Sequence, residues 1–212
     1  MSISGGPDIV ENGLVLHLDA ADSNSYPGTG TTWTDLSGNG NNGTFYNSPN
    51  ISNKIITLSS TNDYLEIPQI LQPLTIDFWF NSPSSANAAI IYAGSNVYNS
   101  ASWQWSVFYY DNTLLWRPNS GGGGSNITSF VSLNKWYHFV MTRGNTRTIY
   151  INGNQISSTA EAAITVTDNI IVGKAGSNYW NGSFSSLKLY NYQLSDSEIL
   201  QNYNATKGRF NL

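Results

Sequence analysis

The carboxylates of this 212-residue chain are few and scattered, which bears first on hydrolytic chemistry. Glycoside hydrolysis uses two carboxyl groups about 5–9.5 Å apart. None of the glutamates lies on an expected strand with an acidic neighbour two residues away, and Glu198 fits a helix cap. His17 and His138 are isolated, as is typical of residues on a sheet face. We therefore expect no enzyme, with an atypical glycosidase as the weakest alternative.

Oxygen-bearing side chains gather in two early loops and have the chemistry of a calcium site. Ca²⁺ prefers carboxylate, carbonyl and amide oxygens, and nearby glycines would let backbone carbonyls turn inward. The candidate ligands are Asp19, Asp22, Asp35, Asn39 and Asn41. The same residue types also build Asx turns and left-handed loop positions without any metal. A bound Ca²⁺ and plain loop chemistry both stay open from the residues alone.

Aromatic rings suited to stacking on sugars are frequent between positions 98 and 180. Some lie on one side of an expected strand by the period of two, and others fall in expected loops. The candidate carbohydrate-binding residues are Tyr98, Trp103, Trp105, Tyr109, Trp116, Tyr179 and Trp180. One face of the hairpin must be core, so some of these rings serve only packing. We expect Tyr179 and Trp180 to form an exposed pair.

These side chains must be positioned by β-strands, and residues 135–158 show the pattern most clearly. Trp136 to Thr142 is aromatic and β-branched, which suits a half-buried strand. Asn152-Gly153 is typical of a type I′ hairpin turn, because both central residues of that turn need positive φ. The stretch therefore predicts an antiparallel meander of three strands.

The rest of the chain repeats this pattern and gives the fold class. A capping box, Ser195 to Glu198, predicts one short helix ending near Asn204. Further strands are expected at 13–19, 55–58, 64–67, 74–80, 89–93, 102–110, 113–116, 127–131, 170–173 and 184–190. No alternation of strands and helices is present. The sequence therefore predicts an all-β, two-sheet antiparallel jelly-roll sandwich with one short C-terminal helix.

No shift in composition marks a domain boundary. Residues 13–212 are expected to form one jelly-roll domain, since all-β sandwiches commonly reach this length. Residues 1–12 are expected to form an N-terminal arm, because Gly5, Gly6 and Pro7 favour flexibility.

The composition excludes several partners. Only 10% of residues are charged and the formal net charge is -4, with no Lys/Arg cluster, so we expect no nucleic-acid partner. No apolar run approaches the ~20 residues that span a bilayer, so we expect no membrane insertion. The chain has no cysteine and its first residues lack the pattern of a signal peptide. If the protein acts outside a cell, we expect it to leave by lysis, as virion parts do, or within a larger assembly, and so to lie on a virion surface or in the extracellular space after lysis.

Several pieces of the chain, in order, resemble laminin G-like domains of the concanavalin A-like lectin/glucanase superfamily. They are the 35–44 loop, strand 74–80, the meander with Trp136-Tyr137-His138-Phe139-Val140 and Ile149-Tyr150-Ile151-Asn152-Gly153, and strand 184–190 leading into 194–199. The opening 13–20 with Tyr26-Pro27-Gly28 and Trp33-Thr34-Asp35 is similar to domains of tailed-phage structural proteins. The resemblance implies a jelly roll that binds carbohydrate or protein, often with one Ca²⁺ at the sheet rim.

In that family an Asp-Glu pair often occupies the last long strand, where this chain has Ser185-Ser186, and this departure weakens the calcium expectation. Family glucanases carry Glu-x-Asp-x-Glu on one strand, and this chain has no such motif. We therefore expect a non-catalytic, lectin-like module, exposed on a phage virion as a head decoration or tail-associated protein, that binds host or environmental glycans. The alternative is a purely structural module that packs on virion proteins or on copies of itself.

Overall fold

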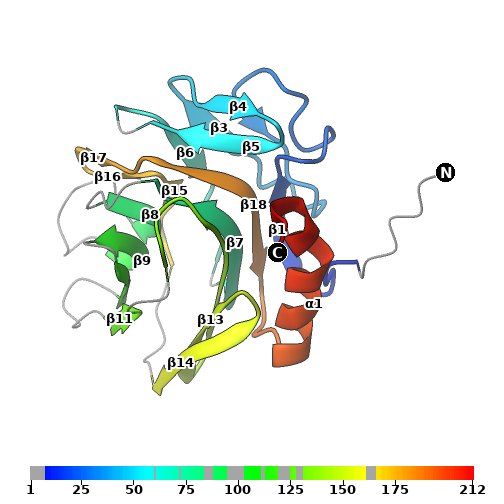
Figure 1. The fold of residues 1–212 in the computed structure, drawn as a ribbon, viewed down its shortest axis with the longest axis vertical. Helices are drawn as coiled ribbons and strands as arrows, with labels where there is room; N and C mark the ends of the chain where they lie inside the picture. Colours follow the sequence, from blue (N-terminus) through cyan, green and yellow to red (C-terminus); the bar gives the residue numbers. More distant parts are fainter. Residues whose placement is uncertain are drawn as a thin grey trace.

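The computed structural model describes residues 8–59, 61–71, 73–83, 88–94, 103–110, 113–118, 125–127, 131–160 and 166–212. Their strands form two antiparallel sheets of eight strands each, packed as a sandwich (Figure 1). Sheet A has the order β14-β13-β12-β7-β18-β5-β4, with β1 also paired to β18. Its strands are β1 (Leu14–Asp19), β4 (Asn50–Ser52), β5 (Ile55–Leu58), β7 (Thr75–Asn81), β12 (Trp136–Arg143), β13 (Thr146–Ile151), β14 (Asn154–Ala160) and β18 (Gly182–Tyr190).

Sheet B has the order β11-β10-β9-β8-β15-β6-β3-β2, and a small β16–β17 hairpin contacts β8. The strands are β2 (Thr32–Trp33), β3 (Gly43–Tyr46), β6 (Tyr64–Ile67), β8 (Ala88–Gly94), β9 (Trp103–Tyr110), β10 (Thr113–Pro118), β11 (Ser125–Ile127), β15 (Ile170–Val172), β16 (Lys174–Ala175) and β17 (Asn178–Tyr179). The predicted sandwich is confirmed. Five strands of two to four residues, β2, β3, β4, β16 and β17, were not predicted, because each lies in a stretch rich in Gly, Asn, Ser or Thr that is typical of loops.

The alternation of β7 places its two rows of side chains as expected. Ile76, Phe78 and Phe80 lie in the core between the sheets and are fully buried. The expected hairpin turn is also confirmed, because Asn152 and Gly153 have φ of 52° and 77°. These local rules therefore fix the register of the meander, in which β12 pairs with both β7 and β13.

The outer face of sheet A is covered by the C-terminal helix α1 (Asp196–Thr206) and the 3-10 turn η2 (Lys207–Phe210), drawn in red (Figure 1). The predicted capping box of Ser195 and Glu198 begins the helix. The Trp79 indole donates to Thr206 Oγ1 at 2.8 Å and stacks on Phe210 with ring centroids 4.2 Å apart. Because this cover exists, the second row of β7 is buried as well.

A polar cluster lies beneath α1 at the centre of this covered face. The Asp77 carboxylate accepts hydrogen bonds from Lys188 Nζ at 3.1 Å and from Asn202 Nδ2 at 2.8 Å, and it lies 3.0 Å from His138 Nε2. All four side chains belong to residues with 0% exposure. Burial alone would raise the pKa of Asp77, but the Lys188 ammonium and the His138 ring hold that pKa well below its usual range. The cluster therefore joins β7, β12, β18 and α1 through charge.

The described part of the predicted N-terminal arm, residues 8–12, is held against the same face. Val10 is buried, its N–H donates to Asn202 Oδ1 at 2.8 Å, and its carbonyl accepts from the Tyr190 hydroxyl at 3.0 Å. Residues of the expected arm therefore already contact the jelly-roll domain at Val10, before the boundary expected at residue 12. Residues 1–7 lie outside the described part of the chain. In the part of the chain that is described, no helix has the length and apolar character needed to cross a membrane.

Candidate functional site

Three tyrosines and one lysine gather on the outer face of sheet B, and we call this group the tyrosine face: Tyr46, Tyr64, Tyr179 and Lys174. Tyr46 and Tyr64 are directly opposite each other on β3 and β6. Their neighbours Phe45 and Leu65 lie in the core, so the two tyrosines point outward. Their rings stack with centroids 4.4 Å apart and an interplanar angle of 1°.

The β16–β17 hairpin brings the other two members of the tyrosine face. Lys174 and Tyr179 are register partners in this hairpin. Lys174 Nζ lies 4.4 Å from the ring centroid of Tyr64 and 5.6 Å from that of Tyr179. Gly173 precedes the hairpin with φ 86°, and a Cβ there would meet Leu58 Cδ1 at 2.3 Å. A glycine is therefore needed for the chain to turn this closely over the core.

The rings of the tyrosine face are accessible from solvent. Tyr46 is 39% exposed, and Tyr64 and Tyr179 are half-buried. Burial, reinforced by Tyr46, Glu66 and Tyr179, raises the pKa of Tyr64, so its hydroxyl keeps its proton at neutral pH. Exposed aromatic faces stack on the C–H faces of sugars, and phenolic hydroxyls exchange hydrogen bonds with sugar hydroxyls.

Polar side chains border the tyrosine face along β6 and the segment before β15. Glu66 accepts a hydrogen bond from Asn169 Nδ2 at 2.6 Å, and Asn169 Oδ1 accepts from the Gln69 N–H at 3.0 Å. The Gln104 amide, on β9, donates to Asp168 at 2.7 Å and accepts from the Thr167 N–H at 2.8 Å. This side of sheet B therefore presents amides and carboxylates beside aromatic rings, which is the usual composition of a sugar site.

The predicted calcium ligands in the 35–41 loop form hydrogen bonds with backbone groups of the loop and of β1. Asp35 accepts hydrogen bonds from the His17 and Ser37 N–H groups at 2.9 Å each and from the Asn41 N–H at 3.0 Å. The Asn39 and Asn41 amides donate to the carbonyls of Leu14 and Val15. This loop therefore satisfies the free edge of β1, which would otherwise expose unpaired backbone groups.

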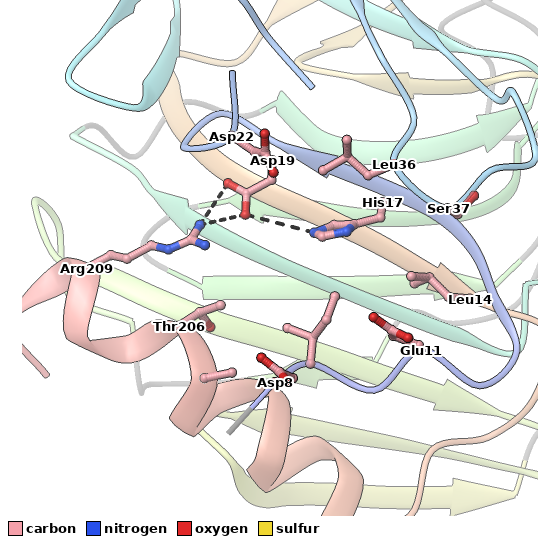
Figure 2. Close-up of a pocket in the computed structure, with 12 residues that line it drawn as sticks. Asp8, Glu11, Leu14, His17, Asp19, Asp22, Leu36, Ser37, Thr206 and Arg209 are labelled. Atoms are coloured by element: carbon pink, nitrogen blue, oxygen red, sulfur yellow. Dashed lines mark hydrogen bonds and ion pairs between the residues drawn. The ribbon is translucent and has the colours of Figure 1, made fainter. Parts of the chain in front are cut away.

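Asp19 and Asp22, the other predicted ligands, line a pocket of about 700 Å³ beside this loop (Figure 2). Asp19 accepts both 2.8 Å hydrogen bonds of Arg209 Nη1, and Asp22 caps the Asn24 N–H at 2.8 Å. Among the described residues, no three His, Asp or Glu side chains are grouped closely enough to hold a metal. The calcium site stays a prediction, and the observed contacts favour loop structure as the role of these side chains.

The pocket is mainly acidic. Its lining residues are Asp8, Ile9, Glu11, Leu14, His17, Asp19, Asp22, Leu36, Ser37, Ala205, Thr206 and Arg209. Figure 2 shows Arg209 and His17 approaching the Asp19 carboxylate from different sides. Burial and the nearby Lys188 ammonium lower the pKa of His17 to about 4, so the imidazole is neutral at pH 7. The Arg209 pair ties η2 to the end of β1, which is a structural role.

Known proteins share features of this sequence and of this fold. A family model described as the concanavalin A-like lectin/glucanases superfamily matches residues 59–200. The chain belongs to this superfamily. No curated protein sequence matches the chain.

Solved structures of the concanavalin A-like type share the fold. The Trypanosoma rangeli sialidase in complex with sialic acid aligns with a TM-score of 0.75 at 14% identity, over 97% of this chain and 36% of the sialidase. The binding domain of Paraclostridial Mosquitocidal Protein 1 aligns with a TM-score of 0.69 at 18% identity, over 92% of this chain and 52% of that one. This concanavalin A-like chain thus spans a third to a half of the structures that it resembles.

Most of the predicted sugar-binding aromatics that are described lie in the core of the concanavalin A-like sandwich. Trp105, Tyr109, Trp116 and Trp180 each have 0% exposure. A ring without accessible surface cannot stack on a ligand, so these residues fill the space between the sheets. The expected exposure of Trp180 is wrong, because its ring packs on Gly182 and its indole donates to Ser82 Oγ at 3.2 Å.

Tyr179 alone of the predicted sugar-binding residues belongs to the tyrosine face. Tyr98 and the side chain of Trp103 lie outside the described part of the molecule. Tyr46, Tyr64 and Lys174 were not predicted. Each alternates with a core residue along its strand, which is a usable pattern, but only the pairing of β3 with β6 brings the rings together.

Proposed function

We propose that the protein is a non-catalytic, glycan-binding module that holds a sugar on the tyrosine face. The observation that carries this proposal is the exposed ring of Tyr46, stacked on Tyr64 beside Tyr179. Such rings offer a flat apolar surface of the size of a pyranose, and stacked aromatic side chains lose little conformational freedom when a ligand binds.

Membership of the concanavalin A-like lectin/glucanase superfamily supports a role in carbohydrate recognition. The structural neighbours contribute the fold alone, although one is described as a binding domain and another contains sialic acid. The site itself must therefore carry the argument, because one fold hosts many functions.

Glycan binding without hydrolysis fits the carboxylates around the tyrosine face. A glycosidase would need two carboxyl groups facing each other across the scissile bond. Glu66, two residues after Tyr64 on β6, accepts a hydrogen bond from Asn169. Asp168, the other carboxylate of this polar border, accepts a hydrogen bond from the Gln104 amide, so each of the two carboxylates is paired with an amide.

The setting that we propose is the surface of a tailed-phage virion, or the extracellular space after lysis. The low charge content of 10% is compatible with this setting, and the expectation itself comes from the resemblance of the sequence at residues 13–35. In this setting the module would contact host or environmental glycans as a head decoration or tail-associated protein.

A structural, assembly-module function is the second candidate, and one edge of sheet A favours it. β14 has seven residues without a charged side chain, and most of them are exposed. The terminal strands β2, β4 and β11 have only two or three residues, and the free edge of β1 is covered by the 35–41 loop. Long uncharged edges invite pairing with another chain, so β14 is the place where a virion neighbour or a second copy would add a strand.

A glycan array followed by titration calorimetry tests the proposed function. We expect the folded protein to bind at least one glycan, and Tyr46→Ala to weaken that binding about tenfold or more, because sugar-stacking rings contribute ~1.4 kcal/mol or more. Tyr203→Ala is the matched control, because it alters a half-buried tyrosine of α1 that also lies beneath a lysine, Lys207. Absence of any glycan bound, or full binding by Tyr46→Ala, would overturn the proposal.

A thermal melt with Ca²⁺ against EDTA, run on the same protein, tests the calcium expectation. A ligand that binds only the folded state adds about 2.7 kcal/mol of stability at a hundredfold excess over its Kd. An upward shift with Ca²⁺ that is lost in Asp22→Asn would support a metal in the early loops. Identical melts in both conditions would leave Asp19, Asp22 and Asp35 with loop structure only.

A further inference from the structure

Lys174 differs from two other cations in the described structure. Lys188 pairs with Asp77, and Arg209 pairs with Asp19. Lys174 forms no ion pair with any carboxylate of the described residues, although it is half-buried. Its ammonium instead lies over the rings of Tyr64 and Tyr179. The tyrosine face therefore contains a positive charge whose N–H donors are not committed to an acid.

The position of this ammonium is fixed before any ligand arrives. Lys174 is the register partner of Tyr179 in a hairpin closed by Gly176, which has φ 60°. The hairpin is anchored at its base, where the Trp180 N–H donates to the Gly173 carbonyl at 2.8 Å. Two ring contacts restrict the lysine stem further. Because the lysine side chain is already held in place, binding a ligand requires little further loss of its conformational entropy.

We propose that the tyrosine face selects sugars that carry a carboxylate, with the sugar ring on the tyrosines and the carboxylate on Lys174. This inference rests on the proposed glycan-binding function and names its ligand class. An ammonium–carboxylate hydrogen bond is about twice as strong as a neutral one. A neutral sugar would use the rings alone and leave the fixed charge without a partner.

Glu66 favours one orientation of an acidic sugar bound at the proposed site. It lies next to the core-facing Leu65, which follows Tyr64, and its carboxylate is held by Asn169 at 2.6 Å. A second carboxylate placed beside Glu66 would be repelled. An acidic sugar must therefore turn its carboxylate toward β16 and its hydroxyl groups toward Glu66 and Asn169, so one orientation is favoured.

Carboxylated sugars come from two chemical sources, nonulosonic acids such as sialic acid and hexuronic acids. The experiment titrates the full chain with 3′-sialyllactose, with a hyaluronan tetrasaccharide and with neutral lactose. The variants are Lys174→Gln, which removes the charge, and Lys174→Arg, which keeps it. Lys207→Gln is the matched control, because Lys207 Nζ lies 5.2 Å from the ring centroid of Tyr203, away from the tyrosine face.

We expect wild type to bind one acidic probe at least tenfold more tightly than lactose, and Lys174→Gln to lose about 10- to 100-fold for that probe alone. Lys174→Arg and Lys207→Gln should bind like wild type. Raising the salt concentration should weaken acidic-probe binding in wild type more than in Lys174→Gln, because screening acts on the ion pair.

The outcomes separate this inference from the proposed function. Equal binding of the acidic probe by wild type and Lys174→Gln, or tighter binding of lactose, would overturn the selectivity for carboxylates while glycan binding stands. Failure of all sugars, on the array as well as in titration, would overturn both. Loss of acidic and neutral binding together in Lys174→Gln would also overturn it, since the lysine would then serve only to hold the tyrosine rings.

Discussion

The outer faces of the two sheets carry similar side chains, but one face is covered by the chain and the other is accessible. On sheet A, stacked aromatics and a lysine over a tyrosine lie beneath or within the C-terminal α1–η2 segment, as Trp79, Phe210, Tyr203 and Lys207 show. On sheet B, the same kinds of contact join Tyr46, Tyr64, Tyr179 and Lys174, and Tyr46 is 39% exposed. One face is closed by the chain itself, whereas the other leaves its rings and charge available to a ligand.

The comparison shows where charge serves stability and where it is available for recognition. Beneath α1, the Asp77 carboxylate has Lys188, His138 and Asn202 around it. A buried charge is tolerated only with such partners. On sheet B, Lys174 is half-buried and forms no ion pair among the described residues. Changes on sheet A should therefore affect folding, and changes on sheet B should affect binding.

The largest effect is expected for Asp77→Ala. The substitution leaves Lys188 charged and fully buried without an acid, and such broken pairs cost about 3–5 kcal/mol. Urea unfolding followed by tryptophan fluorescence measures the change. Sugar binding at pH 7 should persist in the folded fraction, because the tyrosine face lies on the other sheet.

A double variant makes this test specific. Asp77→Leu with Lys188→Met removes both charges and keeps much of the volume, so it should recover most of the lost stability. A double variant as unstable as Asp77→Ala, or a single variant within 1 kcal/mol of wild type, would show that the ion pair does not hold α1 on sheet A.

A smaller effect, seen as a pH dependence, is expected from His17 in the acidic pocket. Burial and Lys188 lower its pKa to about 4, whereas the unfolded chain titrates near 6.5. Between these values the unfolded state binds a proton that the folded state does not, so stability falls as pH falls from 6.5 to 4. The loss should be on the order of 1–3 kcal/mol. Asp77 also has a lowered pKa, but its contribution is lost only below about pH 4.

His17→Gln isolates this contribution. The unfolding free energy of the wild type should fall as the pH is lowered from 7 to 5.5 and 4.5. The unfolding free energy of the variant should change less over the same range. The same slope in both proteins would assign the acid sensitivity to other groups. A pH series for glycan binding at the tyrosine face should not follow this slope, because the described contacts of His17 lie beside β1 and η2.

Local patterns predicted the fold well because they act within one strand or one turn. The alternation in β7, the Asn152-Gly153 turn and the Ser195–Glu198 capping box each depend on residues close in sequence. Contacts between distant residues lie outside the reach of such patterns. The helix was predicted to end near Asn204 and ends at Thr206, where the hydroxyl accepts a hydrogen bond from Trp79, 127 positions away.

The site was harder to predict because it depends on the register between strands and on which residues pack against each side chain. Trp180 is surrounded in sequence by Asn, Gly and Ser, which indicated exposure, but Gly182 leaves room for its ring to fold inward. The loop chemistry of Asp35 and Asn41 fitted calcium as well as it fits the edge of β1. Only the pairing of β3 with β6 places Tyr46 on Tyr64.

The smallest effect on stability is expected for Tyr46→Ala, which tests whether the tyrosine face is separate from the folded core. The substitution removes a ring that is 39% exposed from one stacked cross-strand pair, and such pairs contribute about 0.2–1 kcal/mol. Urea unfolding should therefore move little, even though the same variant should lose glycan binding. A loss of more than about 2 kcal/mol in unfolding free energy would mean that the Tyr46 ring stabilises the fold, as the Trp79 ring does on sheet A. The tyrosine face would then be a structural surface, and a ligand would have to be sought elsewhere on the molecule.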